Sequence, residues 1–296
     1  MADALPVWPG GVAALSAGDK AEVLVEALPY IRRFRGSTVV VKYGGNAMRG
    51  SDGLALFADD VVLLRAVGMN VVVVHGGGPQ IGEMMTRLGK VPEFVDGLRV
   101  TDADTLEIAR MVLVGKVNRD IVGAVNVAGA PAVGVSGEDA GLLQARARSV
   151  ELGYVGDIDE VRPAILRRLL NEELVPVVAT IGTDEEGQAY NINADTAAGA
   201  IAEALGAEKL VYLTDVEGLR RQPDDAASVL STVSVDELDA MVDEGAVAGG
   251  MVPKATSCTK AVRAGVAHAH ILDGRVPHVL LLEVFTRSGI GTMVAR

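Results

Sequence analysis

The feature that most constrains the fold is a unit that occurs twice in the first third of the chain. A β-branched run at residues 38–41 ends in Lys42 and meets Gly44 and Gly45, and a valine run at residues 71–74 meets the glycine stretch 76–78. Helical periodicity follows the first glycine pair. Strands that alternate with helices pair in parallel, because such crossovers need about a dozen residues. The sequence therefore predicts an α/β protein.

Later segments repeat this alternation. A hairpin-like segment is predicted at residues 153–161, and a long helical pattern covers residues 101–128 and opens on a sequence typical of a capping box, Thr101 to Asp104. We expect a three-layer αβα sandwich with a central, mainly parallel sheet shared by two lobes. The predicted divisions are an N-terminal helical extension (1–35), an N-lobe (36–190) and a C-lobe (191–296). Further strands are predicted at 131–135, 175–179, 209–214, 268–272 and 291–294, and further helices at 20–34, 52–67, 162–170, 194–205, 236–242, 252–263 and 278–285.

Composition excludes several classes of partner. The formal net charge is −12, and Lys and Arg form no run longer than a pair, so nucleic acid and anionic membranes are not expected partners. The single cysteine, Cys258, excludes an intramolecular disulfide and a multi-cysteine metal site. The first 20 residues lack the basic start of a secretory signal, and no apolar run approaches 18 residues, so we expect a cytoplasmic protein.

The two glycine loops are candidate anion sites. Backbone N–H groups of a glycine run can crowd an anion, and the next helix offers its positive end. Both loops should lie at the carboxyl ends of their strands, where open α/β sheets bind ligands. Lys42, at the entrance of the first loop, would supply positive charge. A tight turn and a lysine that reaches to water remain alternatives, and neither loop matches a known nucleotide fingerprint.

Four other polar residues are candidates for the same region. Asn191 and Asp195 precede and open a predicted helix, where they fit either a ligand site or ordinary helix capping. Lys254 follows a proline at another helix start, and either a bound anion or solvent would offset its unfavourable position in the helix dipole. Arg99 could form a two-pronged contact with a carboxylate, or it could be a solvated loop residue. The histidines and Cys258 lack nucleophile or triad spacing and are predicted to be core or loop residues.

Six segments resemble the amino acid kinase family in order and spacing. Two of them, Gly97-Leu98-Arg99-Val100-Thr101 and Asn191-Ile192-Asn193-Ala194-Asp195, are similar to the N-acetylglutamate kinases within that family. The resemblance runs from about residue 20 to the end of the chain. The other four segments are Val41-Lys42-Tyr43-Gly44-Gly45, Val74-His75-Gly76-Gly77-Gly78-Pro79, Leu213-Thr214-Asp215-Val216-Glu217-Gly218 and Gly249-Gly250-Met251-Val252-Pro253-Lys254.

The resemblance implies a role for each matching residue. Lys42 and Lys254 would stabilise a transferring phosphoryl group, and Asp195 would organise the two lysines. Gly76, Gly77, Arg99 and Asn191 would hold N-acetyl-L-glutamate in the N-lobe. The nucleotide would be ATP with Mg²⁺ carried mainly by its phosphates, so no protein metal ligand is assigned. The ATP-binding residues would be Lys42, Gly44, Gly45, Thr214, Asp215, Val216, Gly218, Leu219 and Lys254, most of them in the C-lobe.

The implied reaction is phosphorylation of the side-chain carboxylate of N-acetyl-L-glutamate, the second step of arginine biosynthesis. Related acceptors (acetylaminoadipate, glutamate, aspartate, carbamate or UMP) and a non-catalytic arginine-sensing subunit are the alternatives. The N-terminal helix and the segment 285–293 are similar to arginine-inhibited, hexameric members of the family, although that helix could also pack only on its own subunit. The residues implied for arginine are Lys209, His268, Glu283 and Gly291.

Overall fold

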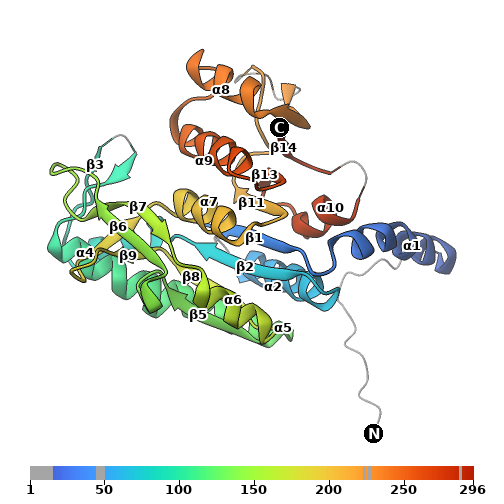
Figure 1. Ribbon diagram of the computed structural model, residues 1–296, viewed down its shortest axis with the longest axis horizontal. Coiled ribbons are helices and arrows are strands. Elements are labelled where there is room, and N and C mark those ends of the chain that lie inside the picture. Colours follow the sequence, from blue (N-terminus) through green and yellow to red (C-terminus); the bar gives the residue numbers. More distant parts are fainter. Residues whose placement is uncertain (1–15, 45–50, 96, 223–224, 226–227, 287–288) are drawn as a thin grey trace, which may run out of the picture.

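A computed structural model describes residues 16–44, 51–95, 97–222, 225, 228–286 and 289–296 (Figure 1). Its centre is an eight-stranded sheet in the order β12-β14-β13-β11-β1-β2-β8-β5. Within it only β13 and β14 pair antiparallel, which confirms the expected mainly parallel sheet. The strands are β1 (Thr38–Tyr43), β2 (Asn70–His75), β5 (Ala132–Ser136), β8 (Val175–Ala179), β11 (Lys209–Thr214), β12 (Thr232–Ser234), β13 (His268–Asp273) and β14 (Thr292–Ala295).

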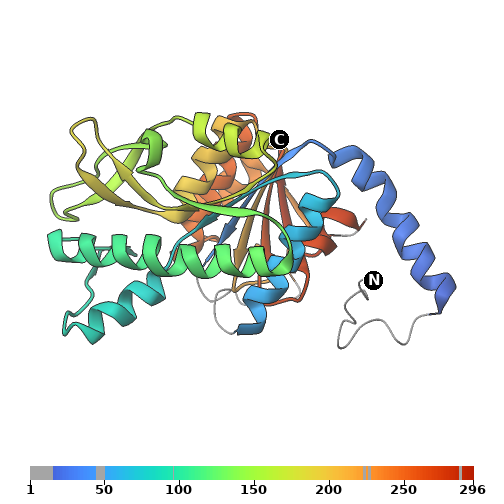
Figure 2. The same cartoon turned by 90° about the horizontal axis from the view of Figure 1, so that it is seen from below.

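Helices cover both faces of this sheet, so the three-layer prediction is confirmed (Figures 1 and 2). One face carries α2 (Ser51–Ala66), α5 (Asn118–Ala128) and α10 (Val279–Phe285). The other carries α6 (Ala164–Asn171), α7 (Ala194–Leu205), α8 (Val235–Asp243) and α9 (Val252–Arg263). Because side chains alternate along a strand, Val39 and Val41 of β1 enter the first core, while Val40 enters the second.

A smaller unit lies beside the carboxyl end of the sheet. Four short strands close into a barrel in the order β10-β7-β6-β9, and a two-stranded hairpin, β3 (Phe94–Val95) with β4 (Leu98–Arg99), extends nearby. Helix α3 (Gly78–Arg87) starts directly at the glycine stretch after β2. The barrel strands are β6 (Leu143–Ala147), β7 (Val155–Val161), β9 (Ile181–Thr183) and β10 (Ala189–Ile192).

Two local predictions were wrong. Residues 155–161 form one strand of the barrel rather than a hairpin, and their antiparallel partner β6 was not predicted at all. The long helix is α4 (Ala103–Arg110), a π-helical segment Met111–Val117 and then α5. Its N-cap is Asp102, whose carboxylate accepts from the Thr105 N–H, so the Thr101 capping box does not form. Thr101 is instead buried in a bridge to Gly153.

Helix α1 (Ala17–Phe34) projects from the body of the molecule (Figures 1 and 2). It opens with a capping box, in which the Ser16 hydroxyl accepts from the Asp19 N–H and the Asp19 carboxylate accepts from the Ser16 N–H. Its last residue, Phe34, is buried, so only the carboxyl end of the helix joins the core. Within the described parts of the chain, no helix combines the length and apolar character that crossing a bilayer requires.

Candidate active site

The carboxyl ends of β1 and β2 open into a cavity of about 410 Å³. The residues predicted to be catalytic or to bind the acyl substrate all line it: Lys42, Gly76, Gly77, Arg99, Asn191, Asp195 and Lys254. Lys42, Asp195 and Lys254 come from segments more than 50 residues apart in the sequence, and the parallel topology brings these segments to one edge of the sheet. The cavity therefore forms at the place that open α/β sheets reserve for ligands.

Asp195 lies between the two predicted lysines. Its Oδ1 is 3.0 Å from Lys42 Nζ, and its Oδ2 is 3.0 Å from Lys254 Nζ. The three side chains are only 8–17% exposed. Burial alone would raise the pKa of Asp195, but the two ammonium groups outweigh burial and hold that pKa below its usual value. Lys42 is thus paired within the protein, and the alternative of a lysine that reaches to water is wrong.

The starts of helices α7 and α9 position Asp195 and Lys254 of this trio. Asn193 is the N-cap of α7, and its side-chain oxygen accepts from the Asp195 and Thr196 N–H groups. Lys254 lies in the first turn of α9, beside Pro253. Asn191 is not at the helix start but in strand β10, so the capping alternative belongs to Asn193. The positive ends of both helix dipoles consequently meet at the cavity.

The two helices are joined by buried hydroxyl groups behind the trio. Tyr212 Oη lies 3.1 Å, and Ser257 Oγ 3.0 Å, from the Asp195 carbonyl oxygen, and the two hydroxyls are 2.6 Å apart. A Cβ on Gly199 would come within 2.4 Å of Ser257 Oγ, so α7 and α9 approach closely only because this residue is glycine.

The glycine loops border the cavity closely. A Cβ on Gly77 would lie 2.7 Å from Leu113 Cδ2, and a Cβ on Gly44 would lie 3.0 Å from Lys42 Nζ. Side chains at these positions would displace the groups that shape the cavity. Gly45, the second predicted glycine of the first loop, lies outside the described residues.

Arg99 and Asn191 face the cavity from the side of the small barrel. Arg99 Nη2 donates to the Gly78 carbonyl at 2.9 Å, and its guanidinium stacks over the Phe94 ring at 4.8 Å. Asn191 Nδ2 donates to Thr101 Oγ1 at 3.4 Å. Burial lowers the pKa of Arg99, yet the guanidinium stays charged. Arg99 is half-buried and lines the cavity, which favours a ligand contact over the solvated-loop alternative.

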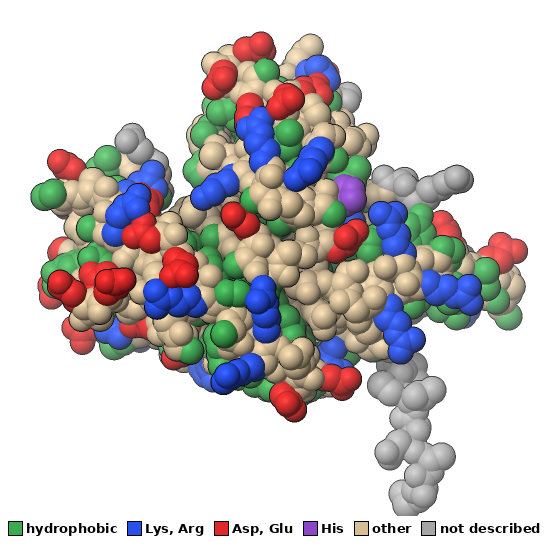
Figure 3. Space-filling model, in the orientation of Figure 1, with side chains coloured by type: hydrophobic (Ala, Val, Ile, Leu, Met, Phe, Trp, Pro, Cys, Tyr) green, Lys and Arg blue, Asp and Glu red, His purple; other side chains and the backbone are tan. Residues whose placement is uncertain are grey.

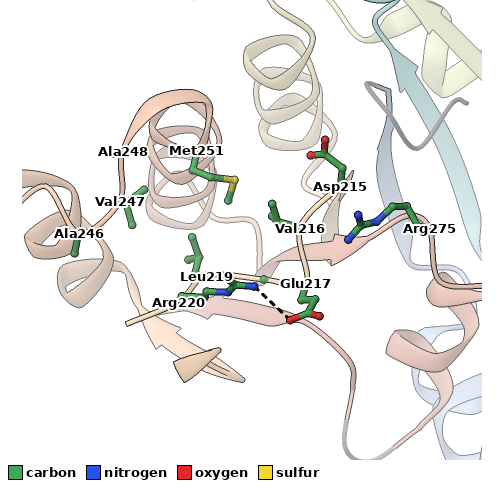
Figure 4. A pocket seen from close by; sticks show the side chains of 11 residues that line it. Asp215, Val216, Glu217, Leu219, Arg220, Ala246, Val247, Ala248, Met251 and Arg275 are labelled. Carbon is green, nitrogen blue, oxygen red and sulfur yellow. Dashed lines mark ion pairs between the residues drawn. The ribbon is translucent and has the colours of Figure 1, made fainter. Parts of the chain in front are cut away.

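A second cavity, of about 320 Å³, lies between the end of β11 and the start of α9 (Figure 4). Val216, Leu219 and Met251 give it an apolar wall, while Arg275 lies on the side of Asp215. Four of the residues predicted for the nucleotide line it, namely Asp215, Val216, Gly218 and Leu219. Thr214 lies next to it at the end of β11, buried, with its hydroxyl donating to Asp215 Oδ1.

Sequence reasoning missed the other walls of this second cavity. Residues 246–248 lie in no motif, and Met251, although it lies in the family-like segment 249–254, was assigned no role. Arg275 is held by two contacts to the Asp273 carboxylate, at 2.8 and 2.7 Å, at the end of β13. An arginine just past a strand end is a signal that could have been noticed, because ligand sites gather there.

Two of the residues suggested for arginine, Lys209 and His268, lie at the opposite edge of the sheet, where β11 and β13 begin. Lys209 Nζ lies 3.1 Å from His270 Nε2, and His270 Nδ1 lies 2.8 Å from Glu283 Oε1. His268 is the register partner of Lys209, and Gly291 packs against the Ile271 carbonyl. Burial lowers the pKa values of both histidines and of Lys209. His270, which joins the cluster, was not predicted as a member of it.

Among the described residues, no group of three or more His, Cys, Asp or Glu side chains is placed to hold a metal ion. The one buried carboxylate among the residues that line the first cavity already forms ion pairs with two lysines. This donor set suits an anion better than a bare cation.

Comparison with known proteins identifies the family of this chain. The model of the amino acid kinase family matches residues 37–273. The chain belongs to the amino acid kinase family. The acetylglutamate kinase of Symbiobacterium thermophilum is 54% identical over 94% of this chain and 98% of its own length. That of Saccharopolyspora erythraea is 53% identical over 94% of each. These relatives confirm the expected enzyme class, an acetylglutamate kinase-type enzyme.

Solved structures agree on the fold. The N-acetylglutamate synthase of Neisseria gonorrhoeae, complexed with coenzyme A and N-acetyl-glutamate, has a TM-score of 0.83 and 31% identity over 93% of this chain. This chain spans 63% of the length of that one. The same synthase complexed with coenzyme A and L-arginine has a TM-score of 0.78 at 29% identity, over 93% of this chain and 65% of its own.

Proposed function

We propose that the chain transfers the terminal phosphoryl group of ATP to the side-chain carboxylate of N-acetyl-L-glutamate. The observation that carries this proposal is the Lys42–Asp195–Lys254 trio at the floor of a cavity walled by Gly76, Gly77 and Arg99. The identity to acetylglutamate kinases over nearly the whole chain supports the choice of acceptor.

The trio suits an acceptor that needs no base. A glutamate side-chain carboxyl has a pKa of about 4.3, so it is already ionised at pH 7 and can attack without losing a proton. The obstacle is repulsion between this anion and the phosphates. Lys42 and Lys254 offset that repulsion and the charge that develops on the transferred group, and positioning with electrostatics is what dominates phosphoryl transfer. Asp195 keeps the two ammonium groups apart at fixed positions.

The acyl substrate would enter from the side of the barrel. Arg99 and Asn191 would hold its free carboxylate and amide groups, because a guanidinium donates to a carboxylate in two parallel bonds. We assign residues 36–190 to this substrate, with Asn191 added from the boundary, and residues 191–296 to the nucleotide, with the extension 1–35 outside both. In support, the walls of the second cavity all fall within residues 215–275.

The nucleotide would span the two cavities. Met251 lines the second cavity and Lys254 lines the first, so the start of α9 borders both. We place the base against Val216, Leu219 and Met251 and direct the phosphates past the start of α9 toward Lys42 and Gly44. Mg²⁺ would travel on the phosphates, since Asp195 is engaged by the lysines and Mg²⁺ retains most of its waters in such sites.

Acyl phosphate formation tests this proposal. Purified protein with ATP, Mg²⁺ and N-acetyl-L-glutamate should yield an acyl phosphate that hydroxylamine traps as a hydroxamate. Acetylaminoadipate, glutamate, aspartate and carbamate serve as competing acceptors, and ADP release with UMP completes the set. Strong turnover of another acceptor with none of N-acetyl-L-glutamate would refute the choice of substrate. The absence of ADP release with every acceptor would favour a non-catalytic arginine-sensing subunit.

We further propose that arginine inhibits the enzyme by binding at Lys209, His268, Glu283 and Gly291, with His270 as an additional member. The cluster offers a carboxylate for a guanidinium and a lysine for a carboxylate, which is the chemistry that arginine presents. A structural neighbour was solved with L-arginine, which supports the idea. Such feedback suits the second step of arginine biosynthesis in the cytoplasm, and a hexamer built through α1 would be the regulated form.

A further inference from the structure

Three polar side chains lie beneath the glycine stretch that follows β2. His75 is fully buried, with Nδ1 2.9 Å from the Gly76 carbonyl oxygen and Nε2 3.1 Å from Asn118 Nδ2. Asn118, also fully buried, donates from the same nitrogen to the Val177 carbonyl at 2.8 Å. The Arg119 guanidinium donates to Asn118 Oδ1. None of these three side chains lines the cavity, so the proposed chemistry does not explain them.

The contacts determine where the imidazole proton sits. A guanidinium can only donate, so the Asn118 oxygen must be the atom that faces Arg119. The Asn118 nitrogen therefore faces His75, and Nε2 must accept. Nδ1 then carries the proton and donates to the Gly76 carbonyl. Burial, aided by the nearby Arg119 charge and opposed by the Gly76 contact, lowers the pKa of His75 to about 4, so the ring is neutral at pH 7.

The Gly76 carbonyl sets the direction of the next N–H group. In a planar trans peptide, the C=O of Gly76 and the N–H of Gly77 point in opposite directions. His75 extends from β2 toward α5, which carries Asn118. Lys42 is the register partner of Val74, so it extends from the opposite face of the sheet, toward Asp195. The carbonyl held on the α5 side therefore directs the Gly77 N–H to the side of the cavity.

Two further features fit this arrangement. The π-helical segment Met111–Val117 ends immediately before Asn118, and such wide turns often mark functional sites. It brings Leu113 and Val117 so close to Gly77 that a Cβ there would lie 2.7 and 3.1 Å from them. On the far side, a Cβ on Gly134 would overlap both Asn118 and Arg119. Strand β5 thus leaves room for Asn118 and Arg119 only because residue 134 is a glycine.

We propose that Arg119, Asn118 and His75 are positioning residues that hold the Gly76–Gly77 peptide in the orientation presenting the Gly77 N–H to an anionic group of the substrate. The kinetic consequence rests on the proposed function, whereas the proton assignment does not. An N–H that is already aimed at developing charge needs no reorientation during the reaction, which is how preorganised donors contribute to rate.

The proton assignment is tested by ¹⁵N NMR of the four histidine imidazoles at pH 7. The His75 signals, assigned by their loss in His75→Asn, should show a protonated Nδ1 and an unprotonated Nε2. Asn118→Leu should perturb the His75 Nε2 shift. A proton on Nε2, or a charged ring, in the wild-type protein would overturn the relay, whatever the substrate turns out to be.

The positioning role is tested by comparing three variants in the hydroxamate assay. His75→Phe removes the donor to Gly76 and should lower kcat by roughly 10- to 100-fold, less than outright deletion of an oxyanion-type donor. His75→Asn places an amide nitrogen near the position of Nδ1 and should recover a large part of that loss. Asn126→Ala, which removes a contact to the Ala132 N–H elsewhere on α5, is the control for general destabilisation and should keep wild-type kcat.

Nucleotide affinity separates positioning from unfolding. The dissociation constant of ATP, measured by calorimetry, should stay within about threefold of wild type in folded His75→Phe. A folded His75→Phe protein with kcat within twofold of wild type, or a His75→Asn protein no better than His75→Phe, contradicts the role. If the wild-type protein phosphorylates none of the acceptors, the proposed function fails, while the NMR result still decides the relay.

Discussion

At the scale of single residues, Asp195 decides what the two lysines can do. A carboxylate between two lysines pairs with both and separates them in a nearly dry site, where electrostatic interactions are stronger than in water. Removing either lysine should leave part of the negative charge on the transferred phosphoryl group without a compensating positive charge. We expect Lys42→Ala and Lys254→Ala each to lower kcat by roughly 10²-fold or more. The measurement is steady-state hydroxamate formation at saturating ATP.

A matched control for the lysine variants is Lys116→Ala. Lys116 pairs with Asp120 on the exposed surface of the molecule, so its loss should leave kcat unchanged and stability nearly so. Near-normal kcat in both active-site variants would remove the lysines from the mechanism.

Much of the first cavity could be predicted from single residues, and the reason is physical. A lysine at the end of a valine strand and a lysine at a helix start are each unfavourable without a partner, so Lys42 and Lys254 signalled an anion. His270 and Arg275 were missed because nothing in their neighbours along the chain is unfavourable, and Met251 was missed because an apolar residue gives no sign of a ligand by itself. His270 is an ordinary strand residue until β11 and α10 bring Lys209 and Glu283 to it.

At the scale of elements, the spacing of α7 and α9 sets the distance between Asp195 and Lys254. Gly199→Ala should push the Ser257 hydroxyl away from the Asp195 carbonyl, because the new Cβ would lie 2.4 Å from Ser257 Oγ. We expect a lower melting temperature and a lower kcat. The paired control is Gly123→Ala on α5, where a Cβ meets nothing within 4 Å. That variant should gain about 0.5–1 kcal/mol and keep its activity. A Gly199→Ala enzyme as stable and active as Gly123→Ala would show that the helices tolerate the shift.

A contact between a buried aspartate and a histidine joins two elements on the other face of the sheet. Asp60 of α2 is buried and lies 2.7 Å from His278 Nδ1, at the start of α10. Burial, only partly offset by the contact to His278, raises the pKa of Asp60 to about 6. The folded protein then binds a proton more readily than the unfolded chain between about pH 4 and 6, so this group makes the protein less stable as pH rises through that range.

The difference in unfolding free energy between Asp60→Asn and wild type should therefore shift in favour of the variant from pH 4 to pH 7. The shift should be up to about 3 kcal/mol for a two-unit change in pKa. The comparison must be between variant and wild type at each pH, because His75, with its pKa lowered to about 4, contributes the opposite slope in the same range. Thermal unfolding at pH 4, 5, 6 and 7 is the measurement. A difference in melting temperature that does not change with pH would mean that Asp60 titrates normally.

Element types were predictable wherever one signal dominated. Valine runs gave the central strands because a strand buried on both faces is apolar throughout. The barrel was not predictable in the same way. Strand β6 reads Leu-Gln-Ala-Arg-Ala, which has low β propensity, and it pairs through contacts that only the folded chain provides. The π-helical segment was hidden for a related reason, since its periodicity differs too little from that of an α-helix to be read over seven residues.

At the scale of the whole molecule, α1 is the element whose packing one chain leaves incomplete. Val23, Leu24 and Val25 are 56–73% exposed, and hydrophobic side chains lie on the projecting helix in Figure 3. The carboxyl half of α1 packs on the core through Ala27, Tyr30, Ile31 and the buried Phe34, whose ring lies under Lys209 Nζ at 5.0 Å, whereas the exposed residues 23–25 have no such contact among the described residues. If α1 packs on a second copy, that interface is connected directly to the proposed arginine cluster.

Two changes test this connection. Deletion of residues 1–35 should shrink the oligomer and abolish arginine inhibition while leaving catalysis, but it also removes Phe34 from beside Lys209. The paired substitution Leu24→Glu with Leu28→Glu keeps Phe34 and should likewise shrink the oligomer, because it places charge in the proposed interface. Glu22→Gln is the control on the same helix.

Light scattering and hydroxamate assays with and without arginine are the measurements. Doubly substituted protein that keeps the oligomeric size of the wild type would show that α1 does not join subunits. Protein that dissociates yet keeps full arginine inhibition would show that the cluster acts within one chain.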